Sequence, residues 1–96
     1  MNWGKAVLIV REKEGITQQE LADKIGISRV ALSEIERDKR RPNADTLEQL
    51  AVALNTQPVF IYLIAIDPET DMTEENRARF NKLFPNFHEK LLTFLE

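Results

Sequence analysis

The chain has 96 residues, a length that suggests one compact domain with a short appendage. It has no cysteine and a single histidine, His88, which excludes disulfides, thiolate metal sites and histidine metal clusters, so we expect no metal or other cofactor. The net charge of −3 comes from the tail, because residues 1–66 hold nine basic and nine acidic side chains, whereas residues 67–96 hold four and seven.

Two helices are predicted before residue 26 from apolar spacing and from the residues that begin and end them. The first covers about residues 3–14 and ends at Gly15. Thr17 caps the second helix and forms a capping box with Glu20, which lies three residues later. Gly26 follows as a left-handed stop.

Two further helices follow, each with a polar cap. Ser28 caps a helix that ends near Arg37, and Asn43 or Asp45 caps the next one, after which Asn55 can take the left-handed exit conformation. The apolar residues of these four helices recur at helical spacing and predict the core. They are Trp3, Ala6, Val7, Val10, Leu21, Ala22, Ile25, Ala31, Leu32, Ile35, Leu47, Leu50, Ala51 and Leu54.

Residues 58–66 are apolar on nearly every side and would suit either a buried strand or a helix. We favour a helix, because four short helices precede the segment and no partner strand is evident. Its apolar run is far shorter than the roughly 20 residues that span a bilayer. No signal peptide is evident either, so we expect a cytoplasmic protein with no membrane contact.

Residues 67–96 are predicted to form a helical extension to the domain of residues 1–66. Residues 67–71 are typical of a connecting turn, and Asp71 or Thr73 then caps a helix. The last helix covers about residues 86–95. We expect the extension to pack, to dimerise or to bind a protein partner through its seven large apolar residues. These are Phe80, Leu83, Phe84, Phe87, Leu91, Phe94 and Leu95.

The second and third predicted helices, joined by a three-residue turn, have the spacing of a helix-turn-helix. Ala22 is small enough for the helices to cross closely, and Gly26 permits the turn. The inner face of the third helix is apolar, which leaves the outer face near its amino end free to enter a major groove. The base contacts predicted on this face are Ser28, Arg29, Val30 and Ser33.

These residue types suit the reading of DNA. Arg29 can donate two hydrogen bonds to guanine, Val30 can contact a thymine methyl group, and Ser33 can bond several base edges. The amino end of the second helix offers free N–H groups to a phosphate, and a basic run follows the third helix. The predicted phosphate contacts are Thr17, Gln18, Gln19, Lys39, Arg40 and Arg41.

A family pattern is spread over residues 5–66. Its segments are Arg11, residues 15–18, 19–22, 25–28 and 35–37, Pro42, and Leu47 with Leu50, Ala51 and Leu54. In these residues the chain resembles the lambda repressor and Cro family of helix-turn-helix domains, also called the Xre type. The resemblance implies an all-α, five-helix domain that binds palindromic operators as a dimer. It also implies a phosphate contact by Gln18 and an internal ion pair between Arg11 and Glu36.

Three features depart from the family pattern. Asp38 stands where the family usually has glycine, although aspartate tolerates the left-handed conformation better than most residues. Leu8 and Ile9 occupy positions of the first helix that are usually polar, and residues 58–66 are apolar on nearly all sides. We infer that these surfaces and the extension cover one another, within one subunit or across a dimer.

The predicted function is sequence-specific binding of double-stranded DNA by a homodimer that regulates transcription, most simply as a repressor. The sequence has no cysteine nucleophile and no glycine-rich phosphate loop, so we do not expect an enzyme. One alternative is an antitoxin that binds DNA and masks a toxin with its tail. Another is a protein-interaction module without DNA binding. The acidic Glu34 in the third helix slightly favours this alternative. The operator, the regulated genes and any effector cannot be predicted.

Overall fold

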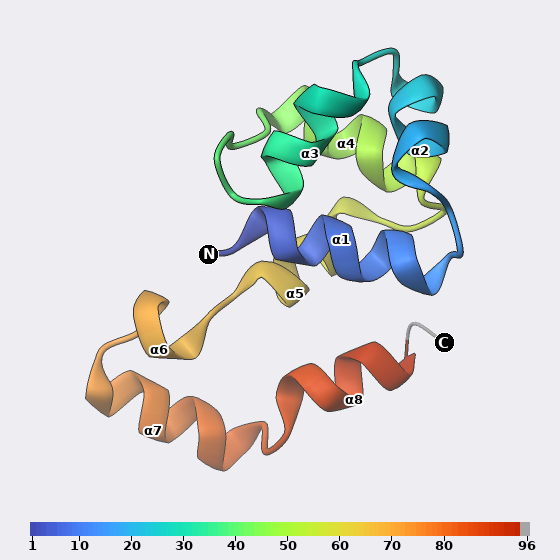
Figure 1. The fold of residues 1–96 in the computed structure, drawn as a ribbon. Helices are drawn as coiled ribbons and strands as arrows, with labels where there is room; N and C mark the ends of the chain where they lie inside the picture. The colour runs from blue at the N-terminus through green and yellow to red at the C-terminus, as the bar shows by residue number, and fades with distance from the viewer. Residues whose placement is uncertain (95–96) are drawn as a thin grey trace. The chain divides into compact units, whose positions relative to one another are not determined.

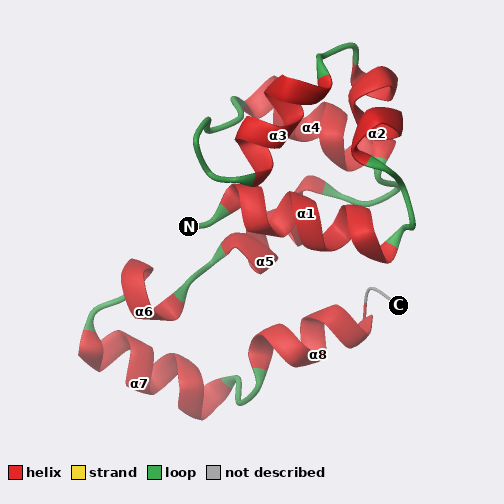
Figure 2. Ribbon diagram, in the orientation of Figure 1, coloured by secondary structure: helices red, strands yellow, loops and turns green. Residues whose placement is uncertain are grey.

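A computed structural model describes residues 1–94, and every regular element in that range is a helix (Figures 1 and 2). The described residues fall into two compact units. One is Asn2–Ala65, and the other begins at Ile66 and includes Met1. The first unit holds α1 (Trp3–Lys13), α2 (Gln18–Ile25), α3 (Arg29–Glu36), α4 (Ala44–Ala53) and α5 (Pro58–Ala65). The second holds α6 (Pro68–Asp71), α7 (Glu74–Leu83) and α8 (Phe87–Phe94).

The predicted helix caps are confirmed. Each cap side chain accepts a hydrogen bond from the backbone N–H three residues later, which satisfies one of the free donors in the first helical turn. These caps are Thr17, Ser28, Asn43 and Thr73, so the two open choices are settled in favour of Asn43 and Thr73. Asn2 caps α1 in the same way, through the N–H of Lys5, a cap that was not predicted.

The turns after α2 and α3 take the left-handed conformation that their sequences predict. Gly26 has φ 74° and ends α2, while its N–H donates back to the carbonyl groups of Ala22 and Asp23. Asp38 has φ 59°, so aspartate takes the conformation for which the family uses glycine.

Residues 58–65 form a helix and not a strand. Ile61, Ile64 and Ala65 of α5 are buried, whereas Val59 and Tyr62 on its other side are exposed. The apolar residues on one side of α5 therefore complete the core, whereas those on the other side lie at the surface.

The core of the first unit lies where all five helices meet. Its largest fully buried side chains are Val7, Leu21, Leu32, Leu50, Leu54 and Ile61. Four predicted core residues, Trp3, Ile25, Ala31 and Leu47, are only half-buried. Ile25 is in the last turn of α2, where it lines a groove beside α4, so its position at the edge of the unit explains the difference.

The start of α1 lies against the backbone at the end of α3. An added Cβ on Gly4 would be 2.1 Å from the carbonyl oxygen of Ile35 and 2.9 Å from that of Glu36. Real Cβ atoms do not approach backbone atoms so closely, so this contact requires glycine at position 4. No local pattern in the sequence indicates this contact, because the atoms that Gly4 meets are more than 30 residues away.

The second unit corrects one prediction. Residues 68–71 form the short helix α6 and not a turn, because Asp67 accepts the N–H of Glu69 and Pro68 occupies the first helical position. In α7 and α8, the rings of Phe80 and Phe87 meet edge to face with centroids 5.1 Å apart. The predicted Leu95 lies outside the described residues. No helix within residues 1–94 is long and apolar enough to cross a membrane.

Candidate nucleic-acid interface

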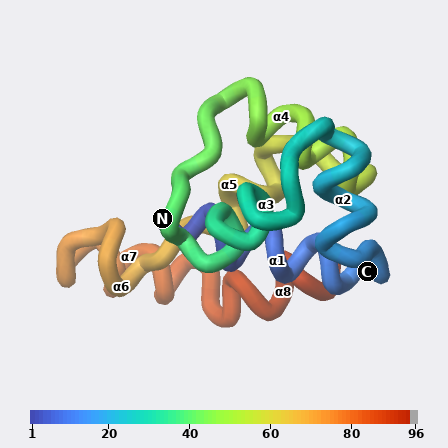
Figure 3. Tube along the Cα trace, turned by 45° about the horizontal axis from the view of Figure 1, so that its top comes forward, coloured from blue at the N-terminus to red at the C-terminus, as the bar shows by residue number. Residues whose placement is uncertain are grey.

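The amino end of α3 is exposed at residues 28–30, and Figure 3 shows this helix beside α2 in the helix-turn-helix. Arg29 is exposed, and Val30 exposes 61% of its surface although it is apolar. Leu32 and Ile35 on the opposite face are buried. An exposed valine beside an arginine gives this face an apolar contact and a cationic donor, which are the two chemistries that read a thymine methyl group and a guanine edge.

The two serines predicted to contact bases are less free than Arg29 and Val30. Ser28 is exposed, but its Oγ accepts the N–H of Ala31 at 3.0 Å. Ser33 is half-buried, and its backbone carbonyl accepts a hydrogen bond from Nε of Arg37 at 3.3 Å. Arg29 and Val30 therefore dominate the exposed chemistry of this face.

The side chains at the amino end of α2 are largely engaged within the protein. Thr17 accepts the N–H of Glu20 and donates its hydroxyl proton to the Glu20 carboxylate, both at 3.1 Å. Gln19 donates to Asp23 at 2.8 Å. The backbone N–H groups of Gln18 and Gln19 are in the first turn and have no acceptor within the helix. These N–H groups are thus the donors best suited to a phosphate at this end.

A buried ion pair joins α1 to α3. Nε of Arg11 donates to Oε2 of Glu36 at 2.6 Å, and its second terminal nitrogen donates to Oε1 at 3.0 Å. Only 3% of the Glu36 side chain and 13% of the Arg11 side chain are exposed. The hydrogen bond to Glu36 raises the pKa of Arg11, against the opposing effect of burial. The pair implied by the family resemblance is present in the structure.

Two further hydrogen bonds extend this ion pair into a network that the sequence analysis missed. Nε2 of Gln18 donates to Oε1 of Glu36 at 2.9 Å, and Arg11 donates to the carbonyl of Ile16 at 2.9 Å. The network therefore fixes α1, the segment before α2, and α2 itself to α3. It also engages one of the two N–H donors of the Gln18 amide, the group that was predicted to contact a phosphate. No local sequence signal indicates these bonds, because Gln18 and Glu36 are 18 residues apart.

The basic run after α3 lies in the loop that leads to α4, and all three of its residues are exposed. The backbone N–H groups of Lys39 and Arg40 both donate to the carbonyl of Glu34. The Arg40 guanidinium also pairs with the Glu34 carboxylate at 3.3 Å. Glu34 thus lies beside a compensating charge, which weakens the view that the α3 face is acidic. Arg41 lies over the ring of Trp3 instead.

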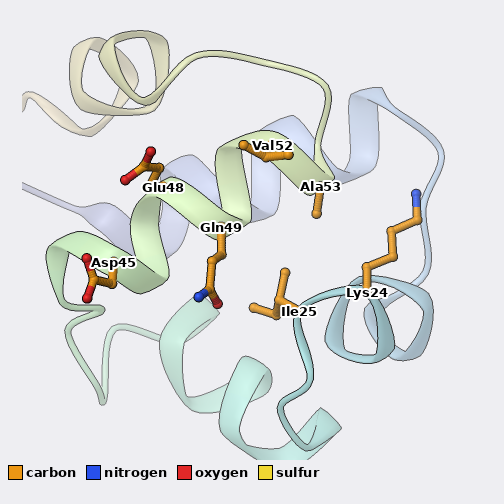
Figure 4. A pocket seen from close by; sticks show the side chains of 7 residues that line it. All are labelled: Lys24, Ile25, Asp45, Glu48, Gln49, Val52 and Ala53. Carbon is orange, nitrogen blue, oxygen red and sulfur yellow. The ribbon is translucent and has the colours of Figure 1, made fainter.

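A groove of about 730 Å³ lies between the end of α2 and the outer face of α4 (Figure 4). Ile25 and Val52 give it apolar walls, while Asp45 and Glu48 place two carboxylates along α4. Carboxylates repel phosphate, so we leave this groove out of the candidate interface. Within residues 1–94, no three His, Asp or Glu side chains are grouped closely enough to hold a metal ion.

Comparisons with known proteins agree with this geometry. Residues 8–61 match the family model described as helix-turn-helix. The chain is 36% identical over 81 residues to an immunity repressor protein of Bacillus phage phi105, covering 84% of this chain and 53% of that relative. It is 39% identical over 61 residues to the HTH-type transcriptional regulator ImmR of Bacillus subtilis strain 168, covering 64% and 48%. The chain thus spans about half the length of these curated relatives.

A solved structure shows the same fold. It is the solution structure, determined by nuclear magnetic resonance, of the DNA-binding domain of the P22 c2 repressor. The TM-score is 0.61 and the sequence identity is 30%, over 79% of this chain and 92% of that domain.

Proposed function

Because this chain belongs to the lambda repressor and Cro family of helix-turn-helix domains, we propose that it is a DNA-binding transcriptional regulator. More specifically, it represses transcription by binding a palindromic operator as a homodimer. The observation that carries the proposal is the exposed pair Arg29 and Val30 on an α3 helix whose inner face is anchored by the Glu36 network. A rigid helix with an exposed reading face is what sequence-specific recognition requires.

In the proposed complex, the amino end of α3 enters the major groove. Arg29 donates to the O6 and N7 atoms of a guanine, and Val30 contacts a neighbouring thymine methyl group. Ser28 and Ser33 add weaker contacts at the two ends of this face. The backbone N–H groups that begin α2 bind one phosphate, and the loop of Lys39, Arg40 and Arg41 binds a flanking phosphate.

Substitution of Arg29 tests the reading face. The operator is first identified by incubating the protein with genomic DNA fragments and sequencing those that it retains. Arg29→Ala should then weaken binding to the operator by about 1–3 kcal/mol and leave binding to random DNA nearly unchanged. Fluorescence anisotropy with labelled duplexes measures both affinities. Arg79→Ala, which removes an exposed arginine of α7, is the matched control and should leave both unchanged.

Two outcomes would count against this part of the proposal. Equal losses on operator and random DNA would make Arg29 a phosphate contact and not a base contact. A wild-type protein that retains no genomic fragment, even at low salt, would contradict DNA binding as such.

The proposal of a homodimer is supported by apolar residues that remain exposed. Val59 and Tyr62 are exposed on α5, and Leu83 and Phe84 are exposed in the extension. Apolar surfaces of this kind mark protein contacts. Pairing of two copies also sets two α3 helices about 34 Å apart, as a palindromic operator requires.

Sedimentation tests the dimer and the surface that forms it. The full chain should sediment as a dimer at micromolar concentration, and Val59→Glu or Leu83→Glu should convert it to a monomer, depending on which surface pairs. Val52→Glu is the matched control, because Val52 is also apolar and is as exposed as Leu83 and more exposed than Val59, but belongs to α4. A wild-type monomer that binds a palindrome tightly and without cooperativity would overturn the proposal.

The exposed apolar residues of the extension also favour a second candidate, in which the protein is an antitoxin whose tail masks a toxin. A small toxin gene next to this one, and a stable complex of the two purified proteins that Leu83→Glu prevents, would favour this candidate. DNA binding through α3 is common to both.

A further inference from the structure

One residue of the basic loop, Arg41, lies against an aromatic ring. Its guanidinium carbon is 5.8 Å from the centroid of the Trp3 ring, within the range of a cation–π contact. Trp3 is the first residue of α1, and the loop from α3 to α4 passes this end of α1 (Figures 1 and 3). The contact therefore joins two segments that are 38 residues apart in the sequence.

The Trp3 ring is itself held in place from several sides. It packs against Tyr62 of α5, with ring centroids 5.7 Å apart and planes tilted by 60°. The backbone just before it is fixed, because Asn2 donates its N–H to the carbonyl of Ala65 at 2.7 Å and caps α1 with its side chain. Gly4, just after it, lies against the α3 backbone. These contacts fix the backbone around Trp3 and one side of its ring.

An arginine held by an aromatic ring differs in charge and in free donors from an arginine held by a carboxylate. Arg40 pairs with Glu34, so its charge is partly neutralised, and a phosphate must compete with that carboxylate. Arg41 lies over an uncharged ring, so it keeps its full charge. A cation–π contact also uses no hydrogen-bond acceptor, so the N–H donors of the guanidinium stay available to a phosphate. Arg41 can therefore bind a phosphate while it keeps its cation–π contact with Trp3.

We propose that Trp3 is a positioning residue for DNA binding: its ring holds the Arg41 guanidinium in place for a backbone phosphate before DNA arrives. The inference rests on the proposed function, since Arg41 needs a phosphate partner. It adds a residue that touches no DNA and that the basic run alone does not indicate. The Trp3 contact raises the affinity for DNA by pre-organisation, because the long flexible side chain of Arg41 no longer has to be ordered on binding.

A double-mutant cycle on the full chain tests the proposal. The probe is a labelled duplex of random sequence and about 20 base pairs, because a phosphate contact is independent of sequence. Trp3→Leu should weaken binding about two- to fivefold. The same substitution should have no further effect in the Arg41→Gln variant. Trp3→Phe, which keeps an aromatic face, should restore most of the affinity, and a structural role alone would not give this pattern.

Fluorescence provides a readout that needs no DNA. Trp3 is the single tryptophan of the chain, so the tryptophan emission of the protein comes from this ring alone. Arg41→Gln should change the emission of Trp3 in the free protein, whereas Lys39→Gln in the same loop should not. Thermal unfolding of each variant checks that it is folded at the temperature of the binding measurement.

The outcomes separate this inference from the proposed function. If wild-type protein binds the duplex but Trp3→Leu weakens binding equally with and without the Arg41→Gln substitution, Trp3 acts through the fold and the inference is wrong. If Arg41→Gln alone leaves either the affinity or the Trp3 emission unchanged, the inference is also wrong, although DNA binding stands. If wild-type protein binds no duplex at low salt, the proposed function itself fails.

Discussion

Replacing Glu36 with alanine should lower the free energy of unfolding by about 3–5 kcal/mol. The carboxylate is 3% exposed and accepts hydrogen bonds from Arg11 and Gln18. Its removal leaves the Arg11 guanidinium without its partner at a position that is only 13% exposed, where water solvates the charge poorly. Urea denaturation of the wild type and the variant, followed by circular dichroism, measures the difference.

The matched control for Glu36→Ala is an ion pair at the surface. Glu75 pairs with Arg79 within α7, and both side chains are more than 70% exposed. Glu75→Ala should therefore change the free energy of unfolding by less than about 1 kcal/mol. A similarly small loss for Glu36→Ala would show that the network contributes little and would contradict the prediction. The double variant Arg11→Met, Glu36→Leu should lose less than the sum of the single losses.

Gly4→Ala should destabilise the protein by about 1–3 kcal/mol, although glycine to alanine within a helix normally stabilises it by about 0.5–1 kcal/mol. The sign reverses because the new Cβ would lie 2.1 Å from the Ile35 carbonyl oxygen and 3.0 Å from the Asp38 nitrogen. All of the nearest atoms belong to backbone, so no flexible side chain can move aside. The start of α1 would have to shift away from the end of α3.

Thermal denaturation of Gly4→Ala beside Lys5→Ala checks this expectation. Lys5 is the next residue of α1 and is exposed, so its substitution should change stability by no more than about 0.5 kcal/mol. An alanine at position 4 that equals or exceeds the wild type in stability would mean that α1 does not approach α3 so closely.

Features that depend on neighbouring residues could be predicted from the sequence, and this explains the success with helix ends. Thr17 and Ser28 each bond a backbone N–H three residues later, so the pattern and the contact occupy the same short segment. Asp38 in its left-handed conformation is a property of one residue. The short helix α6 was missed because Asp67 and Pro68 also begin turns, and four residues carry too little periodicity to decide.

Contacts between distant segments could not be predicted in this way. The Arg11–Glu36 pair came only from the family resemblance, and the Gln18 hydrogen bond to Glu36 was not foreseen. Gly4 faces a backbone atom of Ile35. Every residue type has the same backbone, so the residue at position 35 gives no sign of this contact. The reading face could be predicted, because Arg29 and Val30 follow from helical spacing once the buried face is known. Whether they contact bases stays a prediction.

One face of α3 anchors the helix in the core and the other face is exposed, which makes the helix suitable for redesign. Leu32, Ile35 and Glu36 are buried and hold the helix in place, whereas Arg29 and Val30 are exposed. Variation at the outer positions should therefore cost little stability. A library randomised at Arg29 and Val30 and selected against new operators would exchange the target sequence while leaving the scaffold intact.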